Sequence, residues 1–190
     1  MKSQIRVLGI DDGSFSFGQA RTAVIGVSVR LPGYVEGVMM THVEIDGLDS
    51  TDRIIDMLRN SRYLEQLKLI MLDGAAVGGF NVIDVHRLNR ELDVPVITVT
   101  RDRPDYVEIE NALRKHFEDW EPRLAMMRST ELEEFDTGHT PIYIGRVGMD
   151  REEVGRVLAA SIVQGALPEA LRIAHLIATA VARGESRGRA

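Results

Sequence analysis

Short apolar runs alternate with amphipathic stretches along most of this chain. Residues 5–12, IRVLGIDD, form a branched and nearly all-apolar run before two aspartates, which is typical of a strand buried on both faces. Two valine-rich runs follow at residues 22–31 and 34–45, and the connection at Pro32–Tyr34 predicts a tight turn between them. These runs together predict a three-stranded antiparallel meander.

From residue 49 onward, the hydrophobic pattern alternates between that of a helix and that of a buried strand. Helical spacing of apolar residues occurs at residues 49–61, 83–92 and 105–117, and buried-strand runs lie between them at residues 67–74 and 94–100. Ser50 or Thr51 can cap the first of these helices. Because alternating strands and helices are typical of parallel sheets, we expect an α/β fold with one mixed sheet flanked by helices.

The last third of the chain has a less regular pattern. Residues 123–130 and 140–148 have strand-like patterns, separated by a polar and acidic stretch at residues 131–140. Residues 150–164 and 169–183 then predict two helices. We therefore expect a single domain over residues 1–182, followed by a flexible, arginine- and glycine-rich basic tail at residues 183–190.

Composition limits the possible classes of protein. The chain has 190 residues, of which 44% are hydrophobic and 27% charged, as in an ordinary soluble globular protein. It contains no apolar run long enough to span a membrane. The absence of cysteine excludes disulfides and thiolate sites and, with no secretory pattern at the N-terminus, favours a cytoplasmic location. The net charge of −6 argues against a uniformly basic surface but leaves room for a local basic groove.

The first candidate chemistry is a pair of aspartates at strand ends. Asp11 ends the first predicted strand and Asp73 ends the fourth. If these strands are parallel neighbours, both carboxylates emerge at the carboxyl edge of the sheet, where α/β proteins bind ligands. Two close carboxylates repel each other, and a hard cation such as Mg²⁺ or Mn²⁺ removes that repulsion. We therefore expect a metal site at this edge.

Further carboxylates lie near the start of the first helix, in DGLDSTD. Asp52 lies about one turn into the helix, where it could lean back toward the strand ends and act as a third ligand. Asp49 is an alternative acid, and Asp12 could support Asp11 from the second position of the doublet. The structural alternative is that Asp49 or Asp52 only caps the helix and that Asp12 only forms a turn.

The order of these residues resembles endonuclease V, a family with the RNase H-like fold that cleaves DNA or RNA beside deaminated adenine (inosine). GIDDG matches the family's first strand end through Gly9 and Asp11, and MLDG matches its fourth strand end through Asp73. A hand alignment places Asp52 at the family's helix-borne glutamate, and QGALPEALRIAH is similar to the stretch that opens its last helix. The pattern is most similar to an uncharacterised, mainly archaeal relative, domain-of-unknown-function family ninety-nine.

The resemblance implies an RNase H-like fold and a metal-dependent nuclease. Asp11, Asp52 and Asp73 would hold Mg²⁺ or Mn²⁺ and activate water against a phosphodiester of DNA or RNA. The chain departs from endonuclease V in its histidines, because none lies between Asp73 and His86 and none at residues 146–148. A second interpretation is therefore a non-catalytic protein of the same fold that binds nucleic acid or another partner.

Two other segments could contact a substrate. In AAVGGFN, Gly78 and Gly79 would let backbone N–H groups approach an anion and Asn81 could add a donor, although the segment could equally be a plain turn. Arg101 and Arg103 follow a predicted parallel strand and could bind phosphates, or pair with nearby aspartates. Four of the five histidines, at positions 42, 86, 116 and 175, share no metal-ligand spacing, and packing or surface roles are expected for them.

Overall fold

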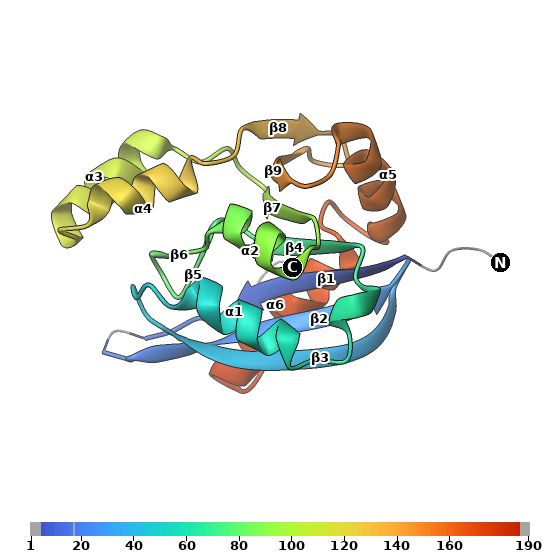
Figure 1. Ribbon diagram of the computed structural model, residues 1–190, viewed down its shortest axis with the longest axis horizontal. Helices are drawn as coiled ribbons and strands as arrows, with labels where there is room; N and C mark the ends of the chain where they lie inside the picture. The colour runs from blue at the N-terminus through green and yellow to red at the C-terminus, as the bar shows by residue number, and fades with distance from the viewer. Residues whose placement is uncertain (1–4, 17, 187–190) are drawn as a thin grey trace.

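The computed structural model describes residues 5–16 and 18–186, which fold around a seven-stranded mixed sheet (Figure 1). The strands lie in the order β3-β2-β1-β4-β7-β9-β8, and a separate two-stranded ribbon is formed by β5 and β6. The strands are β1 (Arg6–Asp12), β2 (Arg21–Arg30), β3 (Tyr34–Glu44), β4 (Leu69–Asp73), β5 (Ala76–Val77), β6 (Asn81–Val82), β7 (Val96–Thr100), β8 (Leu132–Phe135) and β9 (Ile142–Val147). The helices are α1 (Ser50–Arg59), α2 (Val85–Leu92), α3 (Tyr106–His116), α4 (Trp120–Met127), α5 (Arg151–Ser161) and α6 (Glu169–Arg183), with a 3-10 turn at Leu64–Gln66.

The direction of the strands confirms the mixed sheet that the sequence predicts. β1, β2 and β3 form an antiparallel meander, and β1, β4 and β7 run parallel to one another. β9 and β8 complete the far side in antiparallel pairing. Since β1 and β4 are parallel neighbours, their carboxyl ends lie at the same edge of the sheet.

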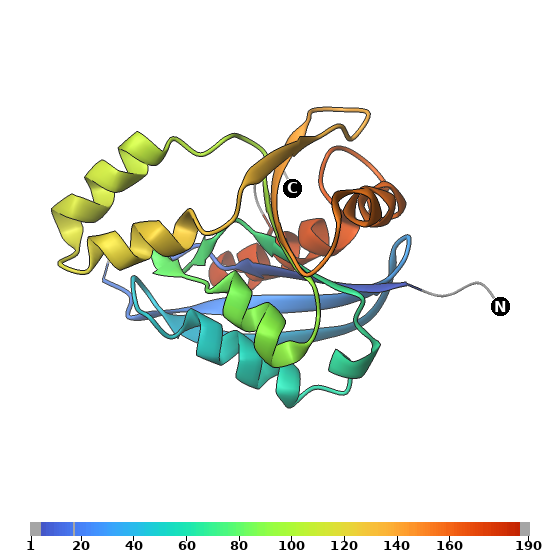
Figure 2. The ribbon, with the colours of Figure 1, turned by 45° about the horizontal axis from the view of Figure 1, so that its top comes forward.

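Each face of the sheet carries its own hydrophobic core. Alternate side chains of β1 point to opposite faces, so Val7 packs in one core and Leu8 in the other. The first core includes α5 and α6, and the second includes α1 and α2, as the two sides of the sheet in Figure 2 show. The sheet is therefore buried between helices, which explains why its parallel strands are nearly continuous apolar runs.

Helix α6 packs unusually close to β1. Gly9 lies against the backbone of the first turn of α6, and a Cβ at this position would overlap with the backbone of Ala170. Only glycine therefore permits this close approach of helix and strand. The contact fixes the distance between the end of β1 and the residues that follow on α6.

One sequence prediction about secondary structure is wrong. Residues 123–130 were expected to form a strand, but residues 120–127 form helix α4, which packs against α3. Arg123 explains the difference, because it is 6% exposed and donates to the carbonyl oxygens of Gly47 and Phe80 and to the Asp119 carboxylate. These contacts attach the α3–α4 pair to the body of the protein. The strand β8 instead lies inside the acidic stretch that follows.

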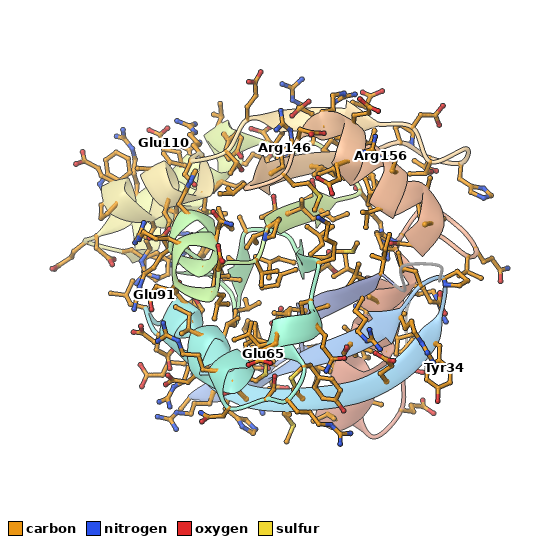
Figure 3. The ribbon with its side chains drawn as sticks, turned by 45° about the vertical axis from the view of Figure 1, so that its right-hand side comes forward. Tyr34, Glu65, Glu91, Glu110, Arg146 and Arg156 are labelled. Atoms are coloured by element: carbon orange, nitrogen blue, oxygen red, sulfur yellow. The ribbon has the colours of Figure 1, made fainter. Side chains whose placement is uncertain are left out.

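Most charged side chains at the surface form ion pairs. Glu91, Glu110, Arg146 and Arg156 lie on the outside of the molecule (Figure 3), and each has a partner of opposite charge within 4.0 Å. Helix α6 extends to Arg183 and ends at Gly184, whose φ of 84° closes the helix. Residues 187–190 of the expected basic tail lie outside the described residues.

Candidate metal centre at the strand ends

Asp11 and Asp73 lie on adjacent parallel strands at the same edge of the sheet. Ile10 of β1 pairs with Leu72 of β4, so the next residue on each strand is an aspartate. Asp11 is 6% exposed, and Asp73 is partly buried. The register of two strands, rather than a local loop, therefore holds the two carboxylates together.

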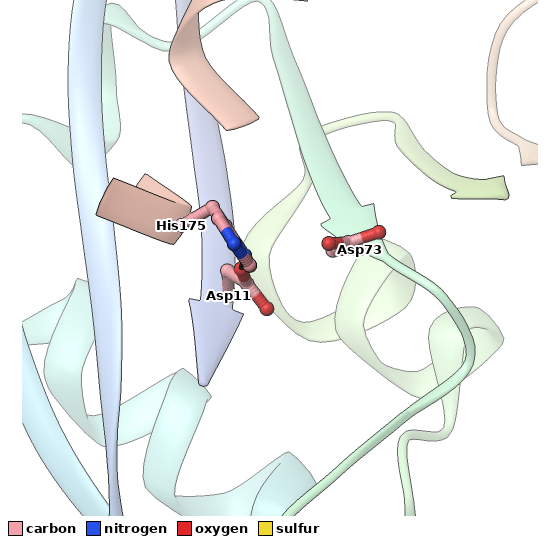
Figure 4. A group of neighbouring side chains, drawn as sticks. All are labelled: Asp11, Asp73 and His175. Carbon is pink, nitrogen blue, oxygen red and sulfur yellow. Dashed lines mark hydrogen bonds and ion pairs between the residues drawn. The ribbon is translucent and has the colours of Figure 1, made fainter. Parts of the chain in front are cut away.

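Helix α6 adds a histidine to this pair. His175 Nδ1 lies 2.8 Å from Asp11 Oδ2, and one ligand atom from each of Asp11, Asp73 and His175 lies within 4.8 Å of the others (Figure 4). Asp11 also accepts a hydrogen bond from the backbone N–H of Asp12 at 2.8 Å. Both oxygens of Asp11 are therefore held in place, one by the chain itself and one by α6. We call Asp11, Asp73 and His175 the strand-end group.

The carboxylates of this group are electrostatically unfavourable as anions. Burial, and next the charge of Asp73, raise the pKa of Asp11 from 3.8 to about 7. Burial also raises the pKa of Asp73, against the opposing positive charges of Arg101 and His175. Two close carboxylates with raised pKa values gain strongly from a bound cation.

Asp12 supports the site from its second position in the doublet. Its Oδ2 accepts the backbone N–H of Gly78 at 3.0 Å, and burial raises its pKa. Asp12 also lines the pocket at the strand ends together with Asp11 and Asp73. The hydrogen bond ties the β5–β6 turn to the end of β1.

Asp52 does not lie in the strand-end group. Its side chain is 59% exposed and forms an ion pair with Arg87 of α2 at 2.6 Å. The expectation that it leans toward the strand ends is wrong, because it points toward α2 from the outer surface of α1. Among the described residues, the third member of the cluster is His175 in its place.

Asp49 serves the local structure at the start of α1. It accepts hydrogen bonds from the side chains of Asn81 and Arg53 and from the backbone N–H of Glu44. Burial alone would raise its pKa, but these hydrogen bonds outweigh burial and lower the pKa. Asp49 occupies the cap position of α1, one residue before the expected Ser50, and makes no side-chain cap bond.

The GGFN segment is a turn rather than an open anion loop. Gly78 and Gly79 have φ values of 57° and 79° and connect β5 to β6. Asn81 is fully buried, accepts the Ser50 N–H at 3.0 Å, and donates to Glu44 O and Asp49 Oδ1 at 2.8 Å each. Because its hydrogen bonds are made within the protein, Asn81 stabilises the start of α1.

The two arginines after β7 lie in different surroundings. Arg101 is exposed, and its charge acts on Asp73, so it lies on the β4 side of the strand-end group. Arg103 is exposed near Tyr106, whose pKa is raised by burial while Arg128 and Arg103 oppose the rise. Of the two, Arg101 is the one whose charge reaches the acids.

Two cavities border the strand-end group. An open pocket of about 420 Å³ is lined by its three residues and by Asp12. A second cavity of about 240 Å³ begins at Gly74, next to Asp73, and is lined mainly by apolar atoms, including those of Tyr106 and Leu132. Asp11 and Asp73 thus lie between the open polar pocket and the apolar cavity.

The donor set of this group is suited to a divalent metal ion. Carboxylate oxygens are the preferred ligands of Mg²⁺ and Mn²⁺, and an imidazole nitrogen is a common additional ligand for transition metals. Burial raises the pKa values of both Asp11 and Asp73, and the charge of Asp73 raises that of Asp11 further, which is the physical reason why a cation would bind here.

Comparison with known proteins decides the family. The sequence profile of the family described as Endonuclease dU matches residues 3–182. The chain belongs to the Endonuclease dU family. A UPF0215 protein of Pyrococcus furiosus is 43% identical over 189 residues, covering 98% of this chain and 96% of the relative.

Solved structures extend the comparison of this Endonuclease dU family member to its fold. The crystal structure of a protein of unknown function from Archaeoglobus fulgidus is 40% identical, with a TM-score of 0.86 over 95% of this chain and 100% of that one. Endonuclease V of Ciona intestinalis, in complex with inosine-containing DNA, is 12% identical, with a TM-score of 0.59 over 90% of this chain and 83% of that one. The latter likeness shows the RNase H-like fold that the sequence resemblance implied.

His175 is the site residue that sequence reasoning missed. It was expected to have a packing or surface role, because it has no metal-ligand spacing to another histidine. A signal was present, since His175 closes the QGALPEALRIAH stretch on which the family resemblance partly rested. No histidine lies at residues 146–148 in and after β9; the histidine of the site lies on α6, because α6 rather than β9 packs beside β1.

No helix in the described part of this Endonuclease dU family chain is long and apolar enough to cross a membrane.

Proposed function

We propose that this protein is a divalent-metal-dependent endonuclease that hydrolyses a nucleic-acid phosphodiester. Asp11, Asp73 and His175 would hold Mg²⁺ or Mn²⁺ at the carboxyl edge of the sheet. The observation that carries the proposal is the pair of carboxylates on adjacent parallel strands, one buried and one partly buried, joined by a histidine. The endonuclease V-like fold of the chain supports this proposal.

The residues of the chain have distinct parts in this reaction. When bound, the metal lowers the pKa of a water molecule and stabilises charge on the attacking and leaving oxygens. The Asp12 N–H and His175 hold Asp11 in a fixed orientation. Arg101, whose charge acts on Asp73, would neutralise a substrate phosphate.

The substrate class we propose is DNA that contains a deaminated base. The family's description names dU, and the Ciona structure contains inosine in its DNA. The apolar cavity beside Asp73 has room for a nucleobase turned out of the helix, which is how enzymes commonly examine damaged bases. His175 supports the nuclease proposal over the non-catalytic alternative, because that alternative was based partly on a missing histidine.

The test is cleavage of labelled DNA duplexes and single strands that carry one deoxyuridine, one deoxyinosine or no modified base, with an RNA strand as a further arm. We expect cleavage of a modified DNA with Mg²⁺ or Mn²⁺, inhibition by EDTA, and loss of cleavage in Asp73→Asn. Asp52→Asn is the matched control, since it removes the same charge outside the strand-end group. Absence of cleavage with either metal, together with no thermal stabilisation of the wild type by either metal, would refute the proposal.

A further inference from the structure

Helix α6 carries a polar row that extends beyond His175. Thr179 and Arg183 follow His175 at intervals of four residues, which places all three on one side of the helix. The three side chains line the same pocket as Asp11 and Asp73. The row therefore continues the strand-end group along α6, away from the sheet edge.

Thr179 is an unusual residue for its surroundings. It is 5% exposed and follows the fully buried Ala178 on a helix that otherwise packs apolar side chains against the sheet. Its hydroxyl makes no hydrogen bond within residues 5–16 and 18–186, although helical threonines can bond to the preceding turn. The Thr179 hydroxyl is not among the fully buried polar atoms without a partner in the described residues, so it is accessible from the pocket and can donate to a ligand there.

Arg183 differs from most arginines of this protein. Its Nε donates to Ser14 Oγ at 2.7 Å, and no carboxylate of the described residues lies within ion-pair distance. By contrast, Arg172 on the same helix forms two hydrogen bonds to Glu169. The terminal nitrogens of Arg183 keep their donors for a ligand, and a guanidinium is well suited to phosphate.

We propose that Thr179 and Arg183, with Ser14, bind a backbone phosphate that flanks the scissile phosphate; this rests on the nuclease function proposed above. Eight residues of α-helix separate His175 from Arg183, a rise of about 12 Å, so the two cannot serve one phosphate. Arg101 directly follows β7, which pairs with β4 on the side away from β1, and its charge acts on Asp73. A nucleic-acid strand would thus run from Arg101 across the strand-end group and along α6.

The arrangement explains how an acidic site can receive a polyanion. A net charge of −6 and the three aspartates that line the pocket repel phosphates, so binding needs cations on both sides of the acids. Phosphate contacts of this kind set the position of the strand and contribute affinity without reading sequence. Arg183 and Thr179 are therefore binding residues rather than catalytic ones.

The test is fluorescence anisotropy with a labelled deoxyuridine-containing DNA duplex in EDTA, where cleavage cannot interfere, over a series of NaCl concentrations. We expect Arg183→Gln to weaken binding about threefold to tenfold and to reduce the slope of log Kd against log salt by about one. Arg183→Lys should restore the slope, because it keeps the charge. Thr179→Val should weaken binding with no change of slope, since it removes a hydroxyl but no charge.

The matched control is Arg90→Gln, which removes an exposed arginine from α2 on the other face of the sheet. It should leave affinity and slope unchanged. If Arg183→Gln binds with wild-type affinity and slope while the wild type still cleaves DNA, the inference about α6 is wrong and the nuclease function stands. If the wild type neither binds nor cleaves any of the oligonucleotides, both proposals are wrong. In cleavage assays, Arg183→Gln should raise KM and leave kcat nearly unchanged.

Discussion

Two groups of aspartates lie near the same edge of the sheet, and their partners differ. At the start of α1, Asp46 accepts the Phe80 N–H, Asp49 accepts three hydrogen bonds, and Asp52 pairs with Arg87. In the strand-end group, Asp11 and Asp73 face each other, and burial raises both pKa values. In the first group hydrogen bonds and an ion pair within the fold engage the carboxylates, whereas in the second the effect of burial outweighs the hydrogen bonds and nearby positive charges.

This contrast shows how a structural acid can be told from a site acid. Asp49 is partly buried like Asp73, yet hydrogen bonds lower its pKa, whereas the pKa of Asp73 is raised. Burial alone therefore does not mark the site. The site is marked by carboxylates that are buried without enough hydrogen-bond donors to offset the cost of burial. Only such carboxylates gain a large stabilising free energy from a bound cation.

The largest effect is expected on catalysis. Asp11→Asn should lower kcat/KM for metal-dependent DNA cleavage by about a thousandfold or more, because a lost metal ligand removes several kcal/mol of transition-state stabilisation. Asp49→Asn should stay within about tenfold of the wild type, provided that the protein remains folded, since its effect reaches the site only through packing. An equal loss in both variants would remove the distinction between the two groups.

The next largest effect is expected on stability. Asn81→Ala should destabilise the fold by about 2–4 kcal/mol in urea unfolding, because it leaves the buried Ser50 N–H without a partner and removes one donor each from the Glu44 carbonyl and the Asp49 carboxylate. Asn111→Ala, an exposed change on α3, should shift stability by less than about 0.5 kcal/mol.

The same variant tests the expected substrate role of Asn81. Below its unfolding temperature, Asn81→Ala should keep kcat/KM within about threefold of wild type. A selective loss of DNA binding with normal stability would instead show that Asn81 contacts substrate.

The pH dependence of stability should differ between the two groups. Asp11 keeps its proton to about pH 7 in the folded state but loses it near 3.8 when unfolded, so the native state binds more protons between these values. The stability contributed by this group therefore falls as pH rises from about 4 to 7 in metal-free protein. Asp11→Asn in EDTA should accordingly be more stable than wild type at pH 8, by about 1–3 kcal/mol, and similar to it near pH 4.

For Asp49, the change of stability with pH should have the opposite sign, and Asp49→Asn should remove it. Its lowered pKa means that the unfolded state takes up the proton first, so its stabilising effect is present at neutral pH and is lost on acidification. Thermal unfolding of the two variants over this pH range measures both signs. Parallel curves for both variants and the wild type would contradict the contrast.

The smallest effect is expected at Asp52. Asp52→Asn removes an exposed ion pair with Arg87, which keeps its partner Glu91, so stability should change by no more than about 0.5 kcal/mol. Metal-induced thermal stabilisation should equal that of the wild type. If the metal no longer stabilised this variant against thermal unfolding, Asp52 would have to be counted among the metal ligands.

The sequence predicted the parts of the fold that depend on local pattern. Buried strands such as residues 6–12 were recognisable as continuous apolar runs, and their aspartate ends located Asp11 and Asp73. Residues 120–127 were less predictable, because their helix depends on Arg123 reaching carbonyl groups of distant segments. Tertiary contacts of this kind override local propensity.

The membership of the site was harder to predict than the fold, for a similar reason. Asp52 and His175 both lie on helices, and the rotation of a helix decides which of its residues faces the strand ends. The rotation of α1 directs Asp52 toward Arg87, and that of α6 directs His175 toward Asp11. Neither rotation is encoded in the spacing of acids and histidines, since packing against the two faces of the sheet determines it.

Gly9 has a consequence for reading other chains of this family. Because its missing side chain determines how far α6 stands from β1, any larger residue there would displace the helix and move His175 away from Asp11 without altering a single polar group. A relative that keeps every aspartate and the histidine but lacks this glycine would thus be expected to have lost the metal-dependent activity proposed here. The missing side chain of Gly9 therefore determines how closely His175 approaches Asp11.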